Sequence, residues 1–168
     1  IKYFIDYQKI YKKNKFIIIT RDVFENLKSL VKKNWYNNLG SSNEIYPYII
    51  EKENFYPVWI SDKDKNFWKN LNKYEKAAFY LIENYRHQKK IKNKIFISYE
   101  SLINNPKQVS NFLKKKLKTQ ETILTKKNIK LIKKKAKQNK KYIFFLKNKI
   151  NQKIFDKLLN INKELASF

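Results

Sequence analysis

The feature that most constrains the fold is an apolar run that ends at an arginine and is followed at once by an amphipathic helix. It lies within NKFIIITRDVFENLKSL, residues 14–30. The run Phe16–Thr20 is β-branched and continuous rather than alternating, which predicts a strand covered on both faces, as in a parallel sheet. Asp22 and Glu25 then have the spacing of a capping box. The stretch therefore predicts a strand, a tight turn and a helix, with Arg21 at the carboxyl end of the strand.

The helix after this turn has an apolar and a polar face. Apolar residues recur at helical spacing and predict the side that packs on a core: Val23, Leu27, Leu30 and Val31. Ser29 falls on the opposite side, which it shares with Asp22 and Glu25. A serine there is either a solvated side chain or a donor to a ligand, and the pattern alone leaves both readings open.

A second strand and several helices complete the pattern. Residues 74–90 predict a long helix, and residues 95–98 predict a second buried strand that ends at Tyr99. Asn105 and Pro106 fit the N-cap and the first position of another helix. The order strand, helix, loop, helix, strand, helices is an α/β pattern. A short helix is also expected over residues 4–11. From residue 123 on the pattern is helical and lysine-rich, with a more apolar segment at residues 142–146 and a last helix over residues 154–165.

The segment between the two halves of this pattern is expected to be irregular. Residues 34–64 hold the one glycine of the chain and two of its three prolines. Aromatic side chains are frequent from Trp35 to Trp68. A long loop of this kind often covers a binding site, whereas the alternative is that its rings simply pack onto the core.

The charge of the chain is strongly basic, with 39 Lys+Arg against 14 Asp+Glu and a formal net charge of +25. A polyanionic partner is one explanation. Codon bias is the other, because the lysines are scattered and accompany many Ile, Asn, Tyr and Phe residues, which AT-rich codons encode.

Only two of the cations are arginines, Arg21 and Arg86. Arg86 follows Glu83 by three residues, which a surface ion pair explains, so Arg21 is the cation most suited to bidentate binding of phosphate or carboxylate.

Several kinds of site lack the residues that they need. There is no cysteine, so a disulfide frame and thiolate chemistry are excluded within this sequence. The single histidine, His87, is expected at the surface and argues against a histidine-based metal site. Asp62 and Asp64 lie in a loop without further ligands. We expect no metal, no membrane-spanning segment and a cytoplasmic location.

Two blocks of the sequence resemble the sulfotransferases that use 3'-phosphoadenosine 5'-phosphosulfate (PAPS). The first is KFIIITRDVFENLKSL, similar to the family's apolar strand, Arg-Asp/Asn-Pro-x-Asp/Glu motif and following serine. The matching residues are Arg21, Asp22, Glu25 and Ser29. Val23 stands where the family has proline.

The second block runs from Tyr74 to Leu117 and looks like the family's long helix, strand, Tyr-Glu-Asp/Ser-Leu motif and following helix. The matching residues are Tyr99, Glu100, Leu102, Asn105, Pro106, Phe112 and Leu113. Lys114 replaces the family's glycine after Phe-Leu. The resemblance covers roughly residues 1–118, and residues 119–168 form a lysine-rich helical tail outside it.

The resemblance implies a fold and a reaction. The fold would be three-layer α/β, a parallel sheet flanked by helices like that of P-loop kinases, and residues 1–168 would be a single, partial sulfotransferase domain. By resemblance, Arg21 and Ser29 bind the 3'-phosphate of PAPS, and Tyr99 contacts its adenine. The sulfuryl group would pass, without a metal, to a hydroxyl or amine of a small-molecule or glycan acceptor, whose pocket residues 35–68 would shape. Neither the acceptor nor an oligomeric state follows from the residues, and no specific nucleic acid is expected.

Three elements of the family pattern have no counterpart here. The Gly/Ser/Thr-rich loop that holds the 5'-phosphosulfate is missing, and two strands are too few for a complete sheet, so we expect both to precede Ile1. The catalytic base is not evident, and Lys2 is the best candidate. The carboxyl-terminal Arg-Lys-Gly phosphate loop of cytosolic members is also absent.

Other interpretations stay open at this point. The chain could be a non-enzymatic basic module that binds nucleic acid or an anionic surface through residues 114–141. It could be a nucleotide or sugar kinase of similar fold, or a remnant with the fold and no activity. Arg21 itself could be a structural ion-pair partner of Glu100 or Glu25.

Overall fold

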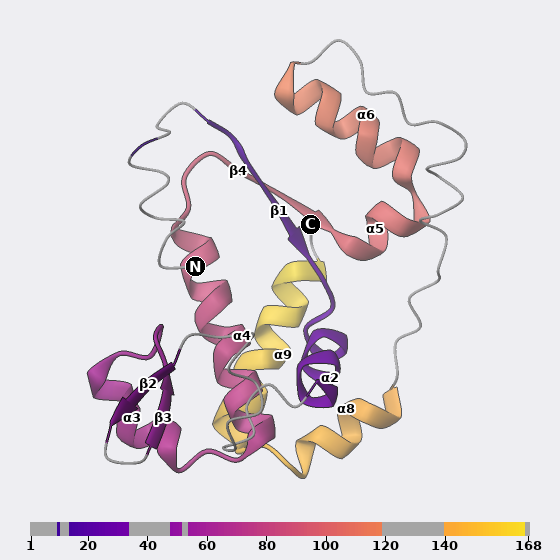
Figure 1. Cartoon of the computed structure of the whole chain (residues 1–168). Helices are drawn as coiled ribbons and strands as arrows, with labels where there is room; N and C mark the ends of the chain where they lie inside the picture. Colours follow the sequence, from indigo (N-terminus) through magenta and orange to yellow (C-terminus); the bar gives the residue numbers. More distant parts are fainter. Residues whose placement is uncertain (1–9, 11–13, 34–47, 52–53, 119–139, 167–168) are drawn as a thin grey trace.

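The computed structural model describes residues 10, 14–33, 48–51, 54–118 and 140–166 (Figure 1). They form a mixed α/β structure with a small parallel sheet, a separate hairpin and a group of packed helices. The elements, with the labels of Figure 1, are β1 (Phe16–Thr20), α2 (Val23–Lys32), β2 (Tyr48–Glu51), β3 (Asn54–Pro57), α3 (Asp62–Lys69), α4 (Lys73–Lys90), β4 (Lys94–Ser98), α5 (Tyr99–Asn104), α6 (Pro106–Leu117), α8 (Lys140–Lys147) and α9 (Gln152–Ala166).

The two predicted strands pair with each other. β1 and β4 run parallel, and Thr20 pairs with Ser98 at their carboxyl ends. Both strands therefore end at the same edge of the sheet, as Figure 1 shows. The described residues contain only these two parallel strands, so a small parallel sheet is confirmed and the three-layer arrangement of P-loop kinases is not.

The prediction that β1 is covered on both faces is wrong for part of the strand. Ile17 and Ile19 are 44% and 58% exposed, whereas Ile97 on β4 is only 5% exposed. The reason lies in the order of elements, because α5 follows directly from β4 and packs against it. Among the described elements, no helix makes a comparable contact with β1.

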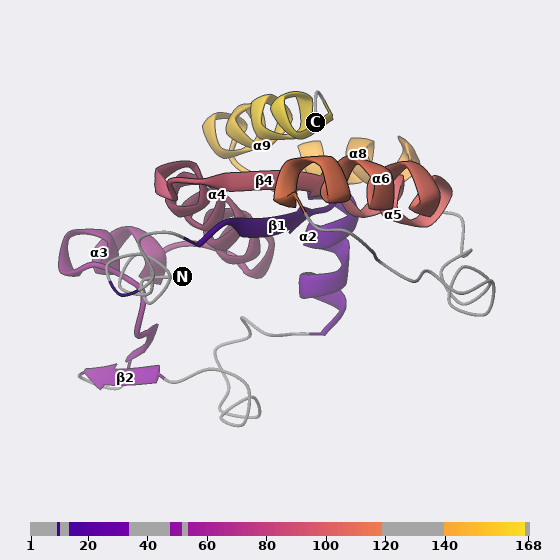
Figure 2. The same ribbon diagram turned by 90° about the horizontal axis from the view of Figure 1, so that it is seen from above.

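The hydrophobic core lies among α2, α4 and α9, which pack against one another (Figures 1 and 2). Leu27 on α2 and Leu158 on α9 are fully buried, and the rings of Phe24 and Phe155 lie 5.7 Å apart. Asn162 on α9 accepts a hydrogen bond of 2.9 Å from the backbone N–H of Val23. The segment described from sequence as a lysine-rich helical tail therefore contains a helix of the core.

The segment expected to be irregular is partly ordered. β2 and β3 form an antiparallel hairpin in which Ile49 pairs with Tyr56, and α3 begins at Asp62. Figure 1 shows this hairpin and α3 away from the parallel sheet, and the rings of Trp59 and Trp68 lie against Phe79 of α4. The prediction was wrong here because the rings of Tyr56 and Trp68 are buried and hold the segment against the core.

The other predicted helices are confirmed, with small differences. α4 begins with a capping box formed by Asn72 and Glu75. Pro106 opens α6 as expected, but Val109 is the buried member of its apolar face while Phe112 is 44% exposed. The predicted helix at residues 4–11 lies, except for residue 10, outside the described residues, and so does the predicted helical stretch up to residue 139. None of the helices in the described ranges has the length and apolarity needed to cross a membrane.

Candidate functional site

The parallel sheet brings Arg21 and Tyr99 together. Arg21 follows β1 and Tyr99 follows β4, and the strand register places these two positions side by side. The guanidinium carbon of Arg21 lies over the Tyr99 ring, 5.4 Å from its centroid. This distance fits a cation–π contact. Both side chains are exposed, so the pair stands at the carboxyl edge of the sheet in contact with solvent.

The turn between β1 and α2 is held by two carboxylates. Asp22 caps α2, because its Oδ1 accepts hydrogen bonds of 3.0 Å from the backbone N–H groups of Phe24 and Glu25. The backbone N–H of Asp22 donates to Glu100 Oε1 at 3.2 Å. Glu100 thus ties the turn to α5, which also carries Tyr99.

The alternative role considered for Arg21, as a structural ion-pair partner, is not what the structure has. Within the described residues the Arg21 guanidinium forms no ion pair with Glu100 or Glu25. Glu100 accepts from the Asp22 backbone instead. The positive charge of Arg21 is therefore not neutralised by either carboxylate.

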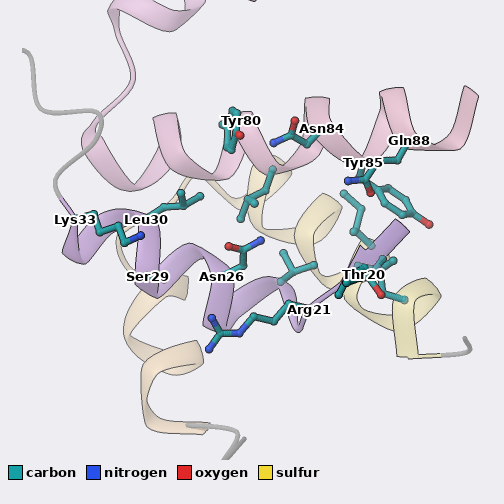
Figure 3. Close-up of a pocket in the computed structure, with 15 residues that line it drawn as sticks. Thr20, Arg21, Asn26, Ser29, Leu30, Lys33, Tyr80, Asn84, Tyr85 and Gln88 are labelled. Atoms are coloured by element: carbon teal, nitrogen blue, oxygen red, sulfur yellow. The ribbon is translucent and has the colours of Figure 1, made fainter. Parts of the chain in front are cut away.

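A pocket of about 260 Å³ lies between α2 and α4 and contains both residues predicted to bind phosphate (Figure 3). Arg21 lines it at the strand end, and Ser29 lines it two turns farther along α2. Ser29 is half-buried. Sequence alone did not establish that these two residues converge on one space, and the pocket supplies that relation.

The walls of this pocket differ in chemistry. On the α2 side, Asn26 and Lys33 join Arg21 and Ser29. On the α4 side the polar lining comes from hydroxyl and amide side chains, namely Tyr80, Asn84, Tyr85 and Gln88. Among the described residues that line the pocket there are two cations and no carboxylate. Such a pocket is suited to an anionic group attached to a polar, hydrogen-bonding body.

The remaining predicted site residues stand outside this pocket. Tyr99 reaches it only through its contact with Arg21. Lys2, the candidate base, lies outside the described residues.

No group of three side chains of the metal-ligating types gathers within the described ranges. Asp62 instead pairs with Lys65 at 2.7 Å, and this hydrogen bond lowers the pKa of the Asp62 carboxyl.

The only histidine and the second arginine lie together on α4. Arg86 forms the expected surface pair with Glu83, at 2.6 Å. His87 was expected at the surface but is half-buried, and its Nδ1 is buried without a hydrogen-bond partner among the described residues. Burial, and then the charge of Arg86, lower the pKa of His87, so this imidazole is neutral near pH 7.

The sequence did not predict that Lys33 on α2 and the residues Asn84 and Gln88 on α4 line one pocket. Lys33 follows Ser29 by four residues, and Gln88 follows Asn84 by four, so each pair shares one face of its helix. That spacing is visible in the sequence. The sequence did not show that these faces of α2 and α4 lie opposite each other across the pocket.

Comparisons with protein-family models, with curated proteins and with solved structures found no match to this chain. The resemblance to sulfotransferases therefore rests on the two sequence blocks alone.

Proposed function

We propose that this chain binds the 3'-phosphate of PAPS through Arg21 and Ser29 and acts as part of a PAPS-dependent sulfotransferase. One observation carries the proposal: Arg21 and Ser29 line the same pocket, while Arg21 also lies over Tyr99. In this proposal the sulfuryl group passes to a hydroxyl or amine of a small-molecule or glycan acceptor. A cytoplasmic location, which suits a cysteine-free sequence, belongs to the same proposal.

The chemistry of the pocket supports a phosphate there. A guanidinium offers a planar fork of donors that matches two phosphate oxygens, and a hydroxyl can donate to a third. The pocket is lined by the carboxyl end of β1, at the edge of the sheet where open α/β sheets bind ligands. The Tyr99 ring, next to the guanidinium, offers an aromatic surface that an adenine can contact.

The role proposed for these residues is binding and orientation. Holding the nucleotide by its 3'-phosphate fixes the position of the sulfuryl group relative to the acceptor, which lowers the entropic part of the barrier. Lys2 remains the proposed base.

The proposal is tested by nucleotide binding to Arg21 variants. Arg21→Ala should weaken binding of adenosine 3',5'-bisphosphate, the product form of the cofactor, by about 2 kcal/mol or more, since a charged hydrogen-bonded pair is lost. It should leave binding of 5'-AMP, which lacks the 3'-phosphate, nearly unchanged. Isothermal titration calorimetry measures both.

The chain offers a matched control. Arg86→Ala removes the other arginine, which is exposed and paired with Glu83 on the surface, and should leave both affinities unchanged. Equal losses for the two nucleotides in Arg21→Ala would contradict the assigned role. So would equal losses in the two arginine variants, because they would indicate a non-specific basic surface.

A further inference from the structure

A second cation lines the pocket at the opposite end of α2. Lys33 is the C-cap residue of that helix, and its side chain lines the same pocket as Arg21 and Ser29. Figure 3 shows Lys33 and Arg21 toward opposite ends of α2, and Asn26 and Ser29 of the same helix also line the pocket. Neither the sequence motif nor the proposed function assigns a role to Lys33.

The helix fixes the spacing of Lys33 and Ser29. Lys33 follows Ser29 by four residues, about 6 Å along the helix axis, whereas Arg21 precedes the N-cap residue Asp22. The backbone N–H of Lys33 donates to the Ser29 carbonyl at 3.1 Å, so the helix is intact up to this residue.

Lys33 lines the pocket, whereas its neighbour Lys32 does not. Lys32 is also exposed and also belongs to the last turn of α2, but it is not among the residues that line the pocket. Both lysines interact alike with the partial negative charge at the helix end. The two lysines therefore have the same charge and differ in that only Lys33 lines the pocket.

The charge of the pocket points to the kind of anion that it takes. The described lining residues include two cations, Arg21 and Lys33, and no carboxylate, which favours an anionic group. A phosphate monoester carries about −1.5 to −2 at pH 7, whereas a sulfate monoester carries one. We propose that Lys33 is a second phosphate-binding cation, opposite Arg21, which makes the pocket selective for a dianionic phosphate monoester. This rests on the proposed function, in which that monoester is the 3'-phosphate of the nucleotide.

The first test compares Lys33→Ala with Lys32→Ala in titrations with adenosine 3',5'-bisphosphate at pH 7.5. Lys33→Ala should lower the affinity about tenfold, the size of one charge-assisted hydrogen bond. Lys32→Ala should stay within about twofold, as expected for an exposed charge. Equal effects of the two substitutions would overturn the proposal, and so would normal affinity in Lys33→Ala when Arg21→Ala is impaired; the latter leaves the proposed function standing.

The second test uses probes without a nucleotide, so that it still decides if the proposed function fails. Methyl phosphate and methyl sulfate have the same shape and differ in charge at pH 7.5. Methyl phosphate should shift the amide NMR signals of Ser29 and Lys33 in the wild type and in Lys32→Ala, and much less in Lys33→Ala. Equal shifts from both esters, or none from methyl phosphate, would overturn the role of Lys33.

Discussion

The guanidinium carbon of Arg21 lies 5.4 Å from the centroid of the Tyr99 ring, across the carboxyl ends of two parallel strands. These residues are 78 positions apart in the sequence. Their contact depends on the register of the sheet, in which Thr20 pairs with Ser98. Arg21 therefore contacts the Tyr99 ring and also lines the pocket between α2 and α4.

Tyr99 is expected to act partly by positioning Arg21. Tyr99→Leu removes the ring and should lower the affinity for adenosine 3',5'-bisphosphate about two- to fivefold, the range of an exposed cation–π contact. Tyr99→Phe keeps the ring and should bind nearly as well as the wild type. Calorimetric titration of both variants checks this, and an equally large loss in Tyr99→Phe would show that the hydroxyl matters instead.

The cap of α2 should matter for stability. Asp22→Ala removes the acceptor of two backbone N–H groups and should cost about 1 kcal/mol of unfolding free energy. Asp22→Asn keeps a side-chain acceptor at the N-cap and should lose much less. Urea unfolding followed by circular dichroism gives both values. Equal destabilisation by the two substitutions would mean that the charge, rather than the cap, is what counts.

Helix α9 should be required for the core. Leu158 is fully buried against this core, and Leu158→Ala is expected to cost about 2–5 kcal/mol because it removes apolar contacts and leaves a cavity. Lys157→Ala changes an exposed neighbour on the same helix and serves as the control. Urea midpoints measure the difference. If Leu158→Ala unfolds like the control, α9 does not pack as described.

The contribution of the α4–α9 contact to the stability of the fold should decrease at acidic pH. Tyr85 donates to Glu164 Oε2 at 2.6 Å and Lys89 donates to the same oxygen at 2.9 Å, which lowers the pKa of the Glu164 carboxyl. A carboxyl with a lowered pKa in the folded state stabilises the fold above its unfolded pKa, near 4.5, and loses that contribution as the pH falls through the folded pKa.

Glu164→Gln should therefore reduce the loss of stability between pH 6 and pH 3. Tyr85→Phe should reduce it partly, because it removes one of the two donors. Urea unfolding at several pH values measures this slope for each variant. A slope equal to that of the wild type in Glu164→Gln would contradict the assignment.

The sequence predicted the elements that depend on local pattern. The β-branched run before Arg21, the cap at Asp22 and the stripe through Leu27 each follow from spacing along one segment. The exposure of Ile19 and the core role of α9 did not follow, because both depend on which distant elements cover a surface. A periodic pattern states that a face is apolar but not what it packs against.

The same limit applies to the candidate site. Arg21, Ser29 and Tyr99 could be selected by motif, since each sits at a defined step after a strand. The roles of Asn26, Lys33 and the α4 wall required the position of α4 opposite α2, which packing of the core determines.

The most direct test of the central claim compares two nucleotides that differ only in the 3'-phosphate. Adenosine 3',5'-bisphosphate and 5'-AMP are titrated into the wild-type protein under the same salt and pH. We predict that the bisphosphate binds at least about 30-fold more tightly, which corresponds to roughly 2 kcal/mol from the phosphate contacts. Equal affinities for the two nucleotides would contradict the claim that the pocket at Arg21 and Ser29 recognises a 3'-phosphate.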